Sequence, residues 1–355
     1  MPSNTPRVSV TQRGTVDDRE SAFPQATELP DGTMVCSYSN AGGQFSTGGT
    51  DWARFDDATA TWTVEGTLLP VTADPPSSNY LKLSRSVDGT VVYAYGARSS
   101  QLDDVRFGER FSEAVVCTST DGARTWSAPS VVTMPTSALE ISHGILALRS
   151  GRLLAPAATI DDGRRGERVI AAVSDDGGVT WPHTVVAMQD PAGELGYLEQ
   201  KLALLDDGRV LATAWTVTLD GLVDQPNSFT ISADEGETWS VPASMGIKGQ
   251  TLSTVHLGGD RFLVLYNRRY GHQGIVGALA VLVGDDWIVD DEILVHDTQR
   301  TRDGRLRDGG VDEMLDFEFG FPTSTARRDG SYLVTYWAVL DGRCGARWAS
   351  LRIDP

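Results

Sequence analysis

The chain has 355 residues, enough for one large domain or two ordinary ones, and its 40% apolar and 22% charged residues are typical of a soluble globular protein. Its net charge of −18 argues against nucleic acid or an anionic membrane as a partner, and is compatible with a neutral sugar or another small polar ligand.

The N-terminal stretch MPSNTPRVSVTQRG lacks the basic-then-apolar pattern of a secretory signal, and no apolar run approaches the length of a membrane span. We therefore expect a cytoplasmic protein. Three widely spaced cysteines, Cys36, Cys117 and Cys344, are expected to be reduced structural thiols.

One pattern recurs along the whole chain: an apolar stretch, a turn similar to Asp-Gly, and a β-branched run. Six copies lie at 26–39, 83–96, 145–158, 202–215, 253–266 and 324–337. Their turn glycines are Gly32, Gly89, Gly151, Gly208, Gly259 and Gly330, which are 51 to 71 residues apart. Each copy predicts a β-hairpin, because glycine accepts the positive φ of such a turn without a Cβ clash.

A second phrase, of eight residues, follows the hairpin in three of the repeats. It reads STDGARTW at 119–126, SDDGGVTW at 174–181 and SADEGETW at 232–239, with weaker versions at 55–62 and 284–287. Each of the first five repeats therefore carries two hairpins, and helical periodicity is almost absent. This predicts an all-β fold: a six-bladed β-propeller with four-stranded antiparallel blades, forming a single domain over residues 1–355.

The sixth repeat is too short for four strands of its own. After its hairpin it has room for one strand, GARWASLRI at 345–353. The N-terminal RVSVTQ at 7–12 alternates correctly and is expected to supply the missing strand, which closes the ring and protects an open sheet edge.

The eight-residue phrase, here called the box, predicts a structural turn. Its Asp is expected to accept hydrogen bonds from nearby backbone N–H groups and from the Ser or Thr hydroxyl, and its Trp is expected to pack between neighbouring blades. Most boxes lack the six or more oxygen ligands that calcium prefers, so neither a metal site nor a cofactor is expected.

Boxes of the form Ser-x-Asp-x-Gly-x-Thr-Trp on the outer hairpins of a six-bladed propeller resemble the sialidase (neuraminidase) superfamily, over the whole chain. The resemblance implies that the boxes lie on the face opposite the active site. The site is then formed by the starts of the inner strands and by the loops that join strands two and three of each blade.

Counting back from the turn glycines gives the residues expected at that end of the axis. The ninth positions are Phe23, Tyr80, Ser142, Glu199, Gln250 and Phe321, and the seventh are Gln25, Lys82, Gly144, Lys201, Leu252 and Thr323. Innermost strands are usually apolar. Charged residues here are costly to bury unless they face a wet channel or one another.

Several positions depart from the sialidase pattern. Ala22 and Trp215 stand where the resemblance implies two arginines that bind a carboxylate, and Phe321 replaces the nucleophilic tyrosine. Glu199 falls where the glutamate that partners the tyrosine is expected. Phenylalanine cannot act as a nucleophile, so conventional sialic-acid hydrolysis is not expected.

Four residues are candidates for catalysis. Glu199 and Asp51 are the candidate carboxylates for glycoside cleavage, the latter in the Gly-rich segment SNAGGQFSTGGTDWAR. Tyr270 is a candidate nucleophile or proton shuttle. His143, paired with Glu140, is a candidate group that titrates near neutrality. The candidates for substrate binding are Lys82, Lys201, Gln250, Arg268, Arg269, Arg54, Gln25 and Trp215.

These features predict an exo-acting glycoside hydrolase that cleaves a terminal sugar from a small glycan and is not a conventional sialidase. One alternative is a polysaccharide lyase, with Tyr270 or His143 as the base and Arg268 or Arg269 against a uronate carboxylate. A non-catalytic carbohydrate-binding propeller is the other.

Overall fold

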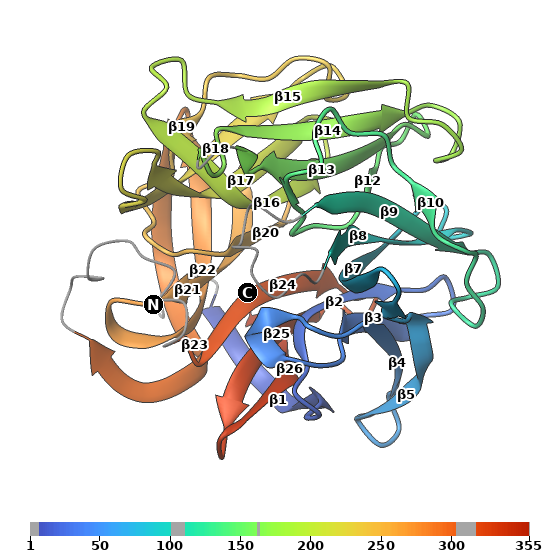
Figure 1. Ribbon diagram of the computed structural model, residues 1–355. Coiled ribbons are helices and arrows are strands. Elements are labelled where there is room, and N and C mark those ends of the chain that lie inside the picture. The colour runs from blue at the N-terminus through green and yellow to red at the C-terminus, as the bar shows by residue number, and fades with distance from the viewer. Residues whose placement is uncertain (1–6, 101–110, 162–163, 303–316, 355) are drawn as a thin grey trace.

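The computed structural model describes residues 7–100, 111–161, 164–302 and 317–354, which form six antiparallel sheets that follow one another around a ring (Figure 1). The sheets are the blades of a six-bladed β-propeller, as predicted. The described residues contain no α-helix, and no helix among them is long and apolar enough to cross a membrane.

The first blade contains β2 (Ala22–Glu28), β3 (Met34–Ser39), β4 (Thr50–Asp56) and β5 (Thr61–Leu69), with the 3-10 turn η1 (Gly43–Phe45) in its middle loop. The second contains β6 (Thr72–Ala73), β7 (Pro76–Arg85), β8 (Val92–Ser100), β9 (Ser112–Ser119) and β10 (Ser130–Val131). The third contains β11 (Leu139–Glu140), β12 (Leu146–Ala147), β13 (Leu153–Thr159), β14 (Arg168–Ser174) and β15 (His183–Gln189).

The fourth blade contains β16 (Leu195–Leu204), β17 (Val210–Thr218), β18 (Asp224–Ser232) and β19 (Ala243–Ser244). The fifth contains β20 (Leu252–His256), β21 (Arg261–Arg268), β22 (Gly271–Val283) and β23 (Asp286–Arg302). The sixth contains β24 (Phe319–Ala326), β25 (Tyr332–Leu340) and β26 (Arg343–Asp354), and β1 (Arg7–Asp17) completes it.

The ring closes as the sequence predicts. Strand β1 pairs antiparallel with β26 from Arg7 opposite Asp354 to Asp17 opposite Ala346, so the two ends of the chain share one blade. The six turn glycines of the inner hairpins all have positive φ, between 59° and 95°.

The three boxes repeat one set of hydrogen bonds. In the first, the Asp121 carboxylate accepts hydrogen bonds from the Ser119 hydroxyl (2.8 Å) and from the backbone N–H of Thr125 (3.0 Å) and its hydroxyl (2.5 Å). Asp176 and Asp234 repeat these contacts in the next two boxes. The boxes are structural turns, as predicted.

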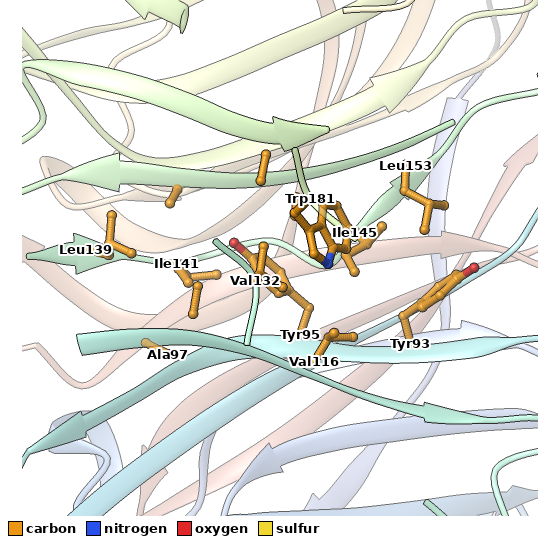
Figure 2. Packing of buried hydrophobic residues seen from close by; sticks show 14 of the residues in the cluster. Tyr93, Tyr95, Ala97, Val116, Val132, Leu139, Ile141, Ile145, Leu153 and Trp181 are labelled. Carbon is orange, nitrogen blue, oxygen red and sulfur yellow. The ribbon is translucent and has the colours of Figure 1, made fainter. Parts of the chain in front are cut away.

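Apolar side chains fill the space between blades. Trp181 of the third-blade box packs in one cluster with Tyr93, Tyr95 and Val116 of the second blade, beside Ile145 (Figure 2). Trp126 and Trp239 pack against the clusters at the preceding and following blade interfaces. The three cysteines are free and buried.

Candidate active site

A pocket of about 250 Å³ lies on the propeller axis, at the end opposite the inner hairpin turns. All six residues at the ninth position before a turn glycine line it: Phe23, Tyr80, Ser142, Glu199, Gln250 and Phe321. The other lining residues are Gln44, Phe45, Ser46, Glu140, Leu198, Trp215, Thr251, Asn267, Arg269, Phe317, Gly320 and Trp337.

Three of the inner strands turn a side chain into the pocket through a β-bulge. Phe23, Glu199 and Phe321 have left-handed backbones, with φ of 53°, 50° and 56°. Each lies inside a break in strand pairing, between Ala22 and Gln25, Leu198 and Lys201, and Gly320 and Thr323. A left-handed backbone at a residue other than glycine is uncommon, and it persists where the surrounding structure enforces it. The bulges re-aim these side chains toward the axis.

Glu140 and Glu199 lie together in the pocket. The inner strand of the third blade is divided into β11 and β12, and Glu140 ends the first piece. Its Oε2 accepts a hydrogen bond of 2.9 Å from the backbone N–H of Glu199, and its Oε1 accepts one from the Ser142 hydroxyl. The Thr251 hydroxyl donates to Glu199 Oε2. Burial, and then the negative charge of Glu140, raise the pKa of Glu199 above its usual range.

Aromatic rings surround this pair of carboxylates. The ring of Phe23 meets that of Phe321 edge-on, with 5.2 Å between centroids, and lies 5.9 Å from Tyr80 and 6.4 Å from Trp337. Phe317 and Trp215 add further apolar surface. An apolar wall with a few convergent polar groups is typical of a small-molecule site.

Arg269 is the cationic side chain in the described pocket lining. Its Nε donates a hydrogen bond of 3.1 Å to Gln250 Oε1, and its guanidinium lies over the rings of Phe317 and Phe319, at 3.8 and 4.3 Å. The predicted binding residues Gln250, Arg269 and Trp215 thus all line the pocket.

Two buried lysines lie beneath the pocket, on the side of the hairpin turns. Lys82 Nζ donates to the backbone oxygens of Tyr80 (3.1 Å) and Ile141 (2.9 Å). Lys201 Nζ donates to the backbone oxygen of Ser142 and lies 3.6 Å from the ring centroid of Phe321. Burial lowers the pKa of Lys201 to about 7 and that of Lys82 well below its usual range.

Neither lysine is among the residues that line the pocket, and the ring of Phe321, which does line it, lies against Lys201. Lys201 instead lines a second axial cavity of about 300 Å³, together with Gln25 and His143. Gln25 Nε2 donates a hydrogen bond of 2.9 Å to the backbone oxygen of Leu83, so Gln25 also lies outside the pocket.

His143 does not form the pair with Glu140 that the sequence suggests. It faces the second cavity, whereas Glu140 lines the pocket. Burial, and then the positive charge of Lys201, lower the pKa of His143 to about 3, so it stays neutral through the range near neutrality.

Asp51 lies at the start of β4, outside the pocket lining. Its carboxylate accepts hydrogen bonds from Asn40 Nδ2 (2.8 Å) and Thr67 Oγ1 (2.7 Å), and pairs with Arg19 at 3.1 Å. The Gly-rich loop does reach the pocket, through Gln44, Phe45 and Ser46. The loop thus lines the pocket, whereas Asp51 lies outside the lining.

Tyr270 and Arg268, on either side of Arg269, are bonded to partners outside the pocket lining. The Tyr270 hydroxyl donates to Asp224 Oδ2, and Trp215 Nε1 donates to Asp224 Oδ1 at 2.6 Å. Arg268 donates to the backbone oxygen of His272 at 2.8 Å and pairs with Glu292 at 3.3 Å. Neither Tyr270 nor Arg268 is in the lining.

Arg54 is remote from the pocket as well. Its Nη2 donates to the backbone oxygens of Gly122 (2.9 Å) and Ala123 (3.2 Å), so it ties the first blade to the box of the second. No group of three or more His, Cys, Asp or Glu side chains within the described ranges is arranged to hold a metal ion.

The sequence pattern names Glu140 only as the partner of His143 and does not indicate that Glu140 lines the pocket or where Asp224 lies. Glu140 lies two residues before the ninth position of its repeat, which Ser142 occupies. A charged residue next to the inner strand is the only feature of the sequence that points to this position of Glu140. Asp224 begins the third strand of its blade, and no sequence pattern marks it. Only the fold brings its carboxylate to Trp215.

Comparison with known proteins matches residues 50–334 to the BNR repeat-like domain. No curated protein matches the sequence. Among solved structures, a protein of unknown function from Dyadobacter fermentans is 18% identical with a TM-score of 0.76, over 98% of this chain and 99% of that one.

Two enzymes of known class share the fold. The NanB sialidase of Streptococcus pneumoniae is 12% identical with a TM-score of 0.67, over 97% of this chain and 70% of that one. An α-L-arabinofuranosidase of Fusarium graminearum is 12% identical with a TM-score of 0.66, over 97% and 98%. Such low identities show the fold alone. Since the matched segment runs from the third strand of the first blade into the sixth blade, this sialidase-like six-bladed propeller belongs to the BNR repeat-like domain family.

Proposed function

We propose that the protein is an exo-acting glycoside hydrolase that removes a neutral terminal sugar, with Glu199 as the general acid and Glu140 as the second carboxylate. One observation carries the proposal: two carboxylates share a small aromatic pocket, and the pKa of one of them is raised by burial and by the other. Glycoside cleavage by this route needs an acid and a base or nucleophile flanking one bond.

The two carboxylates differ in a way that suits these roles. Glu199, with its raised pKa, is suited to hold a proton and deliver it to the leaving oxygen as the glycosidic bond breaks. Both Glu140 oxygens accept hydrogen bonds, from the Glu199 N–H and the Ser142 hydroxyl. That is the acceptor-only role of a carboxylate, which can activate water or attack the anomeric carbon.

The pocket favours a small, neutral sugar. Its volume of about 250 Å³ lies just below the range of about 300–1,000 Å³ that is usual for ligand sites. Two of the arginines that the sialidase resemblance implies are replaced by Ala22, which is fully buried, and by Trp215. Aromatic faces such as those of Trp215 and Trp337 suit the apolar face of a sugar ring.

The comparisons support the class of reaction and not the substrate. A sialidase and an arabinofuranosidase share this propeller, so the fold is compatible with glycoside hydrolysis. The lyase alternative finds less support in its candidate bases, because Tyr270 is bonded to Asp224 and His143 faces another cavity. Of its two arginines, Arg269 lines the pocket and Arg268 pairs with Glu292.

The test is a panel of nitrophenyl glycosides of L-arabinose, D-galactose, D-glucose, L-fucose and sialic acid. We expect turnover of at least one neutral sugar, none of the sialoside, and loss of activity in Glu199→Gln and Glu140→Gln. Glu194→Gln, an exposed glutamate of the same blade, is the matched control. Equal rates for Glu199→Gln and the wild type would end the proposal, and sugar binding without turnover would favour a binding propeller.

A further inference from the structure

Phe45 differs from every other aromatic residue in the described pocket lining because it is exposed. Its relative exposure is 56%, whereas the remaining lining aromatics are buried or partly buried. A lining residue that is still open to solvent lies at the pocket mouth. For a terminal sugar bound inside the pocket, this mouth is a path along which the leaving group can extend.

The loop that carries Phe45 is held in place on several sides. The backbone N–H of Gly43 donates to the Glu20 oxygen at 2.9 Å, and the N–H of Asn79 in the second blade donates to the Gly48 oxygen at 3.0 Å. Gly43 also packs closely on Cys344 of the last blade, where an added Cβ would lie 3.0 Å from the cysteine Cβ. Three blades therefore fix the loop.

Asp51 supports the same loop from β4. It accepts a hydrogen bond from Asn40 Nδ2, and Asn40 Oδ1 in turn accepts the backbone N–H of Gly49 at 2.9 Å. Asn40 also donates its own backbone N–H to the Gly49 oxygen at 3.0 Å, which closes the base of the loop. Asp51 is thus a positioning residue for the aromatic ring at the mouth.

We propose that Phe45 is a preformed aromatic platform that stacks on the leaving-group sugar, the ring next to the bond that is cleaved. This rests on the proposed function. A ring carried by a preformed loop costs little conformational entropy to place on binding, and an aromatic face suits the apolar face of a sugar ring. Phe45 then determines which leaving groups are preferred, and the interior of the pocket recognises the terminal sugar.

The experiment compares two substrates with the same terminal sugar, the one selected by the nitrophenyl panel. One is the disaccharide, and the other is the glycosyl fluoride, whose leaving group has no ring to stack. Phe45→Ala should lower kcat/KM for the disaccharide by about tenfold and leave the fluoride within about twofold. Phe45→Trp should keep both rates. Phe111→Ala is the matched control, since Phe111 is 58% exposed and outside the pocket lining.

The outcomes separate this inference from the proposed function. If the wild type cleaves both substrates and Phe45→Ala changes both equally or neither, the platform is wrong and the hydrolase stands. If the wild type cleaves nothing, the hydrolase fails. Calorimetry on Glu199→Gln then compares L-arabinose with arabinobiose and D-galactose with galactobiose. Weaker binding of only the disaccharides on adding Phe45→Ala supports the platform, and any other result overturns it.

Discussion

The two ends of the propeller follow different rules. At the box end, the Ser and Thr hydroxyls of three loops with different sequences donate the same hydrogen bonds to an Asp carboxylate in three successive blades. At the pocket end, the six equivalent inner-strand positions carry five different residue types, among them Glu199 and Gln250. Residues that are the same in all three boxes stabilise the blades. Residues that differ between equivalent positions line the pocket.

Carboxylates at the two ends show the difference in chemical terms. Hydrogen bonds from Thr125 and Ser119 hold the pKa of the exposed Asp121 well below its usual range, which makes that group a fixed acceptor. Burial and the neighbouring Glu140 raise the pKa of Glu199. A carboxylate at the box end therefore accepts hydrogen bonds, whereas a carboxyl group at the pocket end is suited to donate a proton.

The largest expected effect is on the pocket carboxylates. Glu199→Gln and Glu140→Gln should each lower kcat by about 10²–10⁴. The pKa of Glu199 is higher in the folded state than in the unfolded state. Its ionisation therefore costs stability as the pH rises from the unfolded pKa through the folded pKa. Glu199→Gln should therefore unfold at a higher temperature than the wild type at pH 7 while losing activity. A variant that lost activity by unfolding would contradict this.

The converse is expected at the boxes. Asp234→Ala removes the acceptor for Ser232 and for both the backbone N–H and the hydroxyl of Thr238. It should lower the unfolding temperature by several degrees and leave kcat/KM of the folded protein within about twofold. Differential scanning fluorimetry and steady-state kinetics give the two readings. A large loss of kcat/KM with no change in stability would place chemistry at the box end.

The lysines beneath the pocket should affect stability in a pH-dependent way. Lys201 has a folded pKa of about 7, well below its unfolded value, so the unfolded state binds more protons between pH 7 and the unfolded pKa, and stability rises with pH there. Lys201→Met should remove this slope and stabilise the protein by about 1–4 kcal/mol, more at pH 6 than at pH 9. Urea unfolding at the two pH values measures it. The same gain at both would contradict the lowered pKa.

The smallest effect is expected from Tyr270→Phe. The substitution removes one hydrogen bond to Asp224, which keeps the one from Trp215 Nε1. A change in kcat/KM of less than about threefold is expected, because the bond to Asp224 lies outside the pocket lining and Asp224 keeps its hydrogen bond from Trp215. A loss of a hundredfold or more in the same assay would give Tyr270 a chemical role and revive the lyase alternative.

The repeats made the fold predictable because hairpin turns and boxes are local. Asp-Gly turns need only neighbouring residues, and the spacing of Gly32, Gly89 and Gly151 fixed the order of blades. Counting along regular strands also identified the ring of residues around the pocket. The count fails where a strand is irregular. The inner strand of the third blade is divided into β11 and β12, and Glu140 lines the pocket there in addition to Ser142.

Side-chain direction limited the rest. Asp51 and Tyr270 lie close in sequence to pocket residues, Ser46 and Arg269, yet each points to a partner outside the lining, Asn40 or Asp224. Sequence spacing gives the distance along the chain and not the face on which a loop residue projects. The bulges at Phe23, Glu199 and Phe321 have the same consequence, because a left-handed residue reverses the alternation on which strand patterns depend.

A crystal structure of Glu199→Gln with the disaccharide that the wild type cleaves would show whether the two carboxylates flank the bond. We expect the terminal sugar between the aromatic walls, with the glycosidic oxygen within hydrogen-bonding distance of residue 199 and the anomeric carbon facing Glu140. A sugar bound in the second axial cavity, or in the pocket with its glycosidic bond turned away from both carboxylates, would contradict this expectation.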